Sequence, residues 1–152
     1  MTDKPATRHR FTLVEWIGVD AGIVALVASF LPWYRLADNL VGRAAPGAPT
    51  STTAWQMNFL GWFPVVALLA VSVLIMAQLF GRQIQMLTSL WMTLAVLGVV
   101  MILLRWITVP KSGGEPALVA GFGLYLGLGA AIVSLVTGFL AFRGSQRAQT
   151  AD

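Results

Sequence analysis

Residues 13–33 read LVEWIGVDAGIVALVASFLPW, and only Glu15 and Asp20 in this stretch are charged. A transmembrane helix needs about 20 apolar residues, each rising 1.5 Å, to cross about 30 Å of hydrocarbon. Three later stretches have the same length and character, and each is bounded by glycine, proline or charge. The sequence therefore predicts an all-α integral membrane protein, a four-helix bundle with transmembrane helices over about 13–33, 60–80, 86–107 and 117–142.

The composition agrees with this fold class. The 152 residues are 57% hydrophobic and 11% charged, with a mean hydropathy of +0.77, whereas an ordinary soluble domain is about 25% charged. We expect one transmembrane domain over 13–142, with tails at 1–12 and 143–152 and a long outer loop at 34–58. The first span is longer than the apolar region of about 7–15 residues in a cleavable signal peptide, so we expect it to be retained.

Lysine and arginine set the expected orientation, because cytoplasmic loops carry an excess of them. The bias predicts cytoplasmic termini in a multi-pass protein of the cell membrane, plasma or inner. The composition, rich in Ala, Gly and Arg and poor in Lys, is typical of a bacterium with a GC-rich genome. The net charge is +4, but it lies in tails and loops, so no nucleic-acid partner is expected. The inner cations are Lys4, Arg8, Arg10, Arg82, Arg143 and Arg147, and the outer ones are Arg35, Arg43, Arg105 and Lys111.

Small residues gather on one face of the fourth stretch and on one face of the first, at 100° per residue. In lipid, such faces let two helix backbones approach closely. We therefore predict contacts with other helices, in this chain, in a partner subunit or in a second copy. The predicted helix-packing residues are Gly18, Gly22, Ala25, Gly123, Gly127, Ala131 and Gly138.

The two carboxylates of the first span differ in expected depth. Glu15 lies near the inner boundary, where it reaches headgroups or pairs with Arg10 or Arg82. Asp20 lies about 10 Å inside, roughly opposite the small face, and must be paired, hydrated or protonated there. Three interpretations stay open: a neutral aspartate hydrogen-bonded inside the bundle, a contact with a partner chain, or a proton or cation site. The candidate polar layer is Asp20, Thr93, Ser134 and Thr137.

Aromatic residues gather near the outer boundary, where indole and phenol rings prefer the headgroup level. The predicted outer aromatic belt is Trp33, Tyr34, Trp55, Trp62 and Trp106. In an alternative interpretation, Trp55 folds the outer loop back onto the membrane surface and forms a lid or docking surface with Trp33 and Trp62.

Several chemistries lack the residues that they need. The chain has no cysteine and one histidine, His9 in the N-terminal tail, so thiolate, bis-histidine haem and histidine-rich metal sites are excluded. We expect no cofactor, no metal and no catalytic activity. The expected function is a non-catalytic membrane subunit that associates with a larger membrane complex or with itself. The alternative is a small oligomeric transporter or channel that uses Asp20 as a proton or cation site.

Overall fold

The computed structural model describes residues 12–42, 44–80, 86–109, 111–112 and 115–149. Four of its helices are long and apolar enough to cross a membrane, which confirms the predicted helical membrane architecture at that level. Two short helical segments, α2 (Asp38–Val41) and the 3-10 turn η1 (Ala54–Gln56), lie in the first long connection. The long helices are α1 (Leu13–Phe30), α3 (Phe59–Leu79), α4 (Leu87–Ile107) and α5 (Phe122–Gln149).

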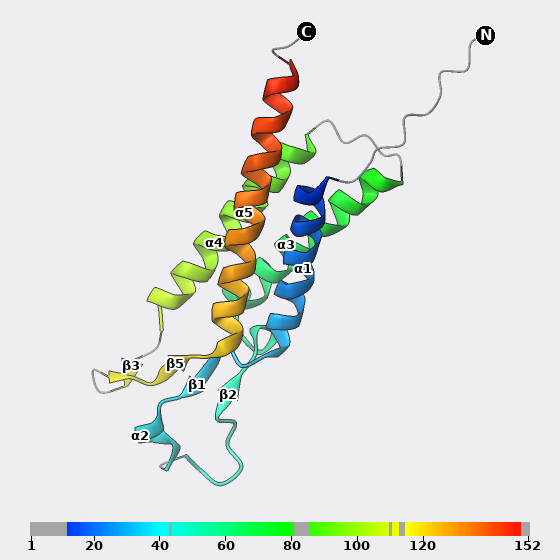
Figure 1. Ribbon diagram of the computed structural model, residues 1–152. Helices are drawn as coiled ribbons and strands as arrows, with labels where there is room; N and C mark the ends of the chain where they lie inside the picture. The colour runs from blue at the N-terminus through cyan, green and yellow to red at the C-terminus, as the bar shows by residue number, and fades with distance from the viewer. Residues whose placement is uncertain (1–11, 43, 81–85, 110, 113–114, 150–152) are drawn as a thin grey trace, which may run out of the picture.

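The four long helices form a bundle in which each helix has two neighbours (Figure 1). Helix α1 packs between α3 and α5, and α4 packs between the same two helices from the other side. Helices α1 and α4 therefore lie diagonally across the bundle, and their outward faces point to opposite sides. Both begin at the end of the bundle where α5 ends (Figure 1).

A small antiparallel sheet closes the other end of the bundle. Its central strand is β1 (Tyr34–Leu36), flanked by β2 (Ser51–Thr52) and β5 (Leu118–Ala120). Two further strands, β3 (Lys111–Ser112) and β4 (Glu115–Pro116), pair with each other. The sequence predicts a loop at 34–58 and a last span from about residue 117, and it does not predict this sheet. Strands of two or three residues are too short to show the alternation by which a strand is recognised.

Trp33 fills the half of the bundle next to this sheet. Its side chain is fully buried, and its indole N–H donates a 2.9 Å hydrogen bond to the carbonyl oxygen of Ala28. A Cβ atom at Gly123 would stand 2.7 Å from the indole Cδ1, and one at Gly127 would stand 3.2 Å from Cζ2. The glycine face of α5 therefore makes room for an indole ring.

Trp91 fills the half of the bundle that lies away from the sheet. It is buried on α4, and its indole N–H donates a 3.1 Å hydrogen bond to Oγ of Ser134. Side chains at Gly18 and Gly138 would collide with or crowd this ring. The small faces were expected to bring backbones together. They do so where Gly22 meets the Leu68 carbonyl, but they mainly accommodate two tryptophans.

Tyr34 ties the sheet to the end of α4. Its hydroxyl donates a 2.9 Å hydrogen bond to the carbonyl oxygen of Arg105, which lies in the last turn of α4. The guanidinium carbon of Arg105 lies 5.2 Å from the centre of the Tyr34 ring, which is cation–π range. Burial raises the pKa of the Tyr34 phenol above its ordinary value of 10.0, and the charge of Arg105 opposes part of that rise.

Replacing Gly127 by leucine should lower the free energy of unfolding by about 1–3 kcal/mol, because the added atoms overpack the Trp33 site. Gly129→Leu on the same helix is the matched control, since nothing lies within 4 Å of a Cβ atom there. Reversible unfolding in detergent measures both variants. Equal stabilities for the two would contradict the assignment of the glycine face to Trp33.

The buried phenol should titrate at high pH. The chain has two tyrosines, so Tyr125→Phe leaves Tyr34 as the only phenol, and the double variant with Tyr34→Phe is the blank. The midpoint in near-ultraviolet absorbance should lie above 10.0, the ordinary value. Because the fold favours the neutral phenol, the contribution of Tyr34 to the free energy of unfolding is fully present below pH 10. This contribution is lost as the pH rises through the raised pKa. A midpoint at or below the ordinary value in the folded protein would contradict this.

Candidate functional site

A groove of about 300 Å³ runs between the outward faces of α1 and α5. Its walls are mostly apolar, with the Tyr125 ring among them, and Asp20 is the only charged residue among the described ones that line it. Gly129 opens the α5 side of the groove, since nothing lies within 4 Å of the position of a Cβ atom there. The lining includes Ile17, Asp20 and Val24 from α1 and Leu126, Gly129 and Val133 from α5.

Asp20 faces outward from the bundle. Its side chain is exposed, whereas Gly18, Gly22 and Ala25 on the opposite side of the same helix are buried. Among the described residues, its carboxylate has no hydrogen bond or ion pair. Asp20 is seven positions beyond Leu13, which puts it about 10 Å along a helix of about 27 Å.

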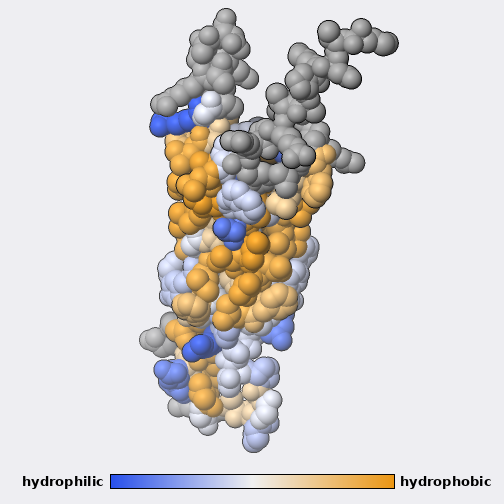
Figure 2. All heavy atoms as spheres, turned by 45° about the vertical axis from the view of Figure 1, so that its right-hand side comes forward, coloured by the Kyte–Doolittle hydropathy of each residue, from blue (hydrophilic) through white to orange (hydrophobic). Residues whose placement is uncertain are grey.

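The surroundings of this carboxylate are hydrophobic. Figure 2 shows hydrophobic side chains over the middle of the molecule and hydrophilic ones mostly toward its ends. An aspartate at the centre of a transmembrane helix costs about 2.5–3.5 kcal/mol on insertion scales. Residues of this kind in membrane spans usually face a protein interior or a water-filled cavity. The groove therefore holds a carboxylate that has no partner among the described residues.

The candidate polar layer does not form in the described part of the chain. Ser134 and Thr137 are buried on α5; Ser134 accepts from Trp91, and the Thr137 hydroxyl donates to the Val133 carbonyl at 2.9 Å. Thr93 is exposed on the outward face of α4, and its hydroxyl donates to Ser89 at 3.0 Å.

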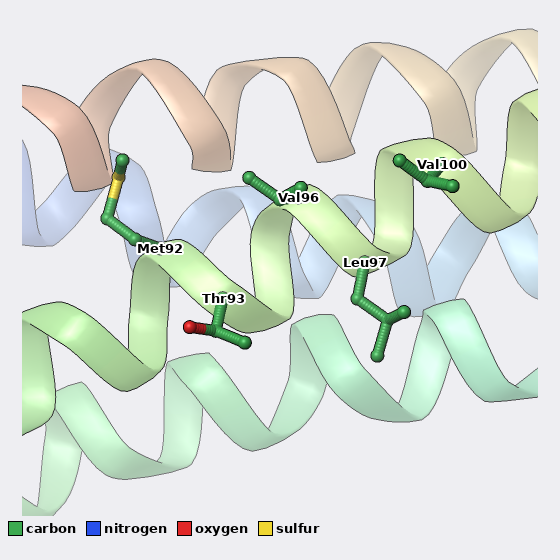
Figure 3. Close-up of a pocket in the computed structure, with 5 residues that line it drawn as sticks. All are labelled: Met92, Thr93, Val96, Leu97 and Val100. Atoms are coloured by element: carbon green, nitrogen blue, oxygen red, sulfur yellow. The ribbon is translucent and has the colours of Figure 1, made fainter.

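The reason for this separation is the ring of helices. Figure 3 shows Thr93, Met92 and Leu97 along α4. These residues line a shallow hollow of about 430 Å³. Because α1 and α4 lie diagonally, Thr93 and Asp20 face opposite sides of the molecule. The small face of α1 is buried in the bundle, so Asp20 cannot be buried there at the same time. An aspartate hydrogen-bonded inside the bundle is therefore not what the structure contains.

Glu15 caps the first helix. Its Oε2 accepts hydrogen bonds from the Thr12 backbone N–H at 2.8 Å and from the Thr12 hydroxyl at 3.0 Å. The Glu15 N–H donates to the Thr12 hydroxyl at 3.4 Å, which completes a capping box. The sequence signal for this cap is the Thr-x-x-Glu spacing at 12–15. The partners proposed from the sequence, Arg10 and Arg82, lie outside the described residues.

The aromatic residues divide into two groups. Trp33 and Tyr34 are fully buried, so they pack the interior and do not face headgroups. Trp55 and Trp106 are 43% and 40% exposed, and Trp62 is half-buried. Trp55 also bears on the lid interpretation. Its indole N–H donates to the Ser29 hydroxyl at 2.9 Å, which fastens the connection to the end of α1.

Comparison with known proteins adds no assignment. No family model, no curated protein and no solved structure matches this chain. The groove at Asp20 is therefore interpreted from its own geometry.

Removing the carboxylate should not weaken the isolated chain, because Asp20 is exposed and has no partner among the described residues. We expect Asp20→Leu to leave the thermal unfolding midpoint of the purified protein unchanged or to raise it. Ser134→Ala is the contrast, since it leaves the buried Trp91 N–H without its acceptor and should cost about 1–3 kcal/mol. A loss for Asp20→Leu as large as that for Ser134→Ala would show that Asp20 has a partner inside the chain.

Proposed function

We propose that this protein is a non-catalytic integral membrane subunit that joins a larger membrane assembly through the groove between α1 and α5. One observation carries the proposal. Asp20 is exposed about 10 Å along α1, in an otherwise uncharged groove on a hydrophobic surface. Contact with another protein would remove this carboxylate from lipid and would also bury the apolar walls.

The interior of the bundle supports a subunit in preference to a single-chain transporter. The buried polar side chains of the described residues are Ser29, Ser72, Ser134 and Thr137. Each makes hydrogen bonds to a helix carbonyl or a tryptophan. Tryptophan rings and aliphatic side chains occupy the space between them. A conducting or transporting path that uses Asp20 would therefore have to form between chains.

The distribution of cations supports an orientation. By position in the sequence, six lysines and arginines belong to the end of the bundle where α1 begins and α5 ends, among them the cluster Lys4, Arg8 and Arg10, and four belong to the other end. We place that end in the cytoplasm of a bacterial cell and the small sheet on the outer side of the plasma or inner membrane.

A single cysteine can report what covers the groove, because the natural chain has none. Gly129→Cys puts a thiol in the groove without a clash, and Val100→Cys on the exposed face of α4 is the matched control. In native membranes treated with a thiol-directed photo-cross-linker, the groove variant should join a different membrane protein in high yield, and the control should not. Native mass spectrometry after gentle extraction should recover the same partner in a fixed ratio.

Two results would contradict the proposal. Equal labelling of both cysteines by lipid alone, with the chain recovered by itself, would show that the groove has no protein partner. Cross-links only to further copies of this chain would favour the oligomeric transporter or channel.

A further inference from the structure

We infer that the partner in this groove is a transmembrane helix of a different protein, and that it presents a lysine or arginine side chain to Asp20. The inference rests on the proposed function and names the chemistry of the partner. The groove presents one charge and few other polar groups, so the Asp20 carboxylate determines which transmembrane helix can bind there.

The groove selects for an apolar helix with a single cation. Ile17, Val24, Leu126 and Val133 offer only hydrocarbon to a partner, and Gly129 lets a neighbouring backbone come close. Asp20 supplies the one charge. A carboxylate surrounded by hydrocarbon is best compensated by a cation that also donates hydrogen bonds. The long aliphatic stem of lysine or arginine would lie along the same apolar walls.

Among the described residues of the long helices, no cation lies at the level of Asp20 along the bundle axis. The cations of these helices are Arg105, Arg143 and Arg147, and Arg147 is farther from Asp20 along the chain than Arg143. Arg105 lies over the Tyr34 ring, at the level of β1, which follows the end of α1. Asp20 lies ten residues before that end, which is about 15 Å along the helix axis. Arg143 is fourteen residues beyond Gly129 on α5, which is about 21 Å. Neither can reach Asp20 within one molecule.

The levels of these residues along the bundle axis also argue against a second copy as the partner. Copies that share one orientation in a membrane hold these residues at the same levels, so Arg105 and Arg143 of a neighbour also miss Asp20. Gly18 of α1 meets Trp91 of α4, so Thr93 is level with Asp20. A neighbouring copy could therefore offer the Thr93 hydroxyl, but that group is neutral and already donates to the Ser89 carbonyl. Among the described residues of the long helices, no cation of this chain or of a second copy is level with Asp20, so we assign the cation to another kind of chain.

Four versions of the Gly129→Cys protein test this inference, each made in cells in place of the natural chain. They carry Asp20 unchanged, Asp20→Glu, Asp20→Asn or Asp20→Leu, and the readout is the yield of the photo-cross-link to the partner. The glutamate keeps the charge, so the cross-link should persist. Asparagine keeps the shape and still accepts hydrogen bonds but cannot neutralise a cation, so the yield should fall at least about tenfold, as it should for leucine. The partner's cross-linked span should contain a lysine or arginine at the level of Asp20.

Other outcomes overturn the inference in distinguishable ways. A cross-link that survives in Asp20→Asn but not in Asp20→Leu would indicate a neutral donor. A cross-linked product with twice the mass of this chain would indicate a second copy, and Thr93→Val would then be the change that abolishes it. A cross-link equally strong in all four versions would mean that the apolar walls alone hold the partner. No protein cross-link even with Asp20 unchanged would overturn the proposed function and this inference together.

Discussion

The burial of the small face of α1 is the constraint on which the rest of the structure depends. Gly18 lies against the indole of Trp91, and Gly22 lies against the Leu68 backbone and the Ser72 side chain, so neither position tolerates a larger residue. The helix can turn only one face inward. Asp20 lies on the opposite face, so the packing that buries the small face leaves the Asp20 carboxylate exposed.

The spans and the small faces could be predicted from the sequence because they depend on length, composition and a period of 3.6 residues. The sheet could not, since its strands are too short to show a pattern and they join connections far apart along the chain. Trp33 shows a similar limit. Its position beside Pro32 indicates a membrane boundary, yet its burial depends on Gly123 and Gly127 of a helix about ninety residues later. Glu15 is different, because the Thr-x-x-Glu spacing at 12–15 is enough to predict its capping box.

The polar side chains of the spans differ in whether they have a hydrogen-bond partner within the described residues. Ser72 donates to the Val19 carbonyl across the α1–α3 contact, and Ser134 receives the Trp91 N–H. These pairs hold helices together because buried polar groups are costly when unpaired. A list of polar residues at one depth cannot distinguish such pairs from Asp20, since depth is only one of two coordinates on a helix. The angle around the helix decides whether a group is used inside the chain or offered outside it.

Asp20 and Arg105 show how that difference bears on function. Both are single charges near apolar surroundings, but Arg105 lies over the Tyr34 ring at the end of α4, where an extended side chain can also reach water. Aspartate is too short to reach water from about 10 Å inside a span. A charge that cannot reach water and has no partner among the described residues of its own chain favours association with a neighbour that compensates it. We expect a hydrophobic residue at position 20 to leave the fold intact and to remove that preference, which is why we propose that the carboxylate serves assembly and not folding.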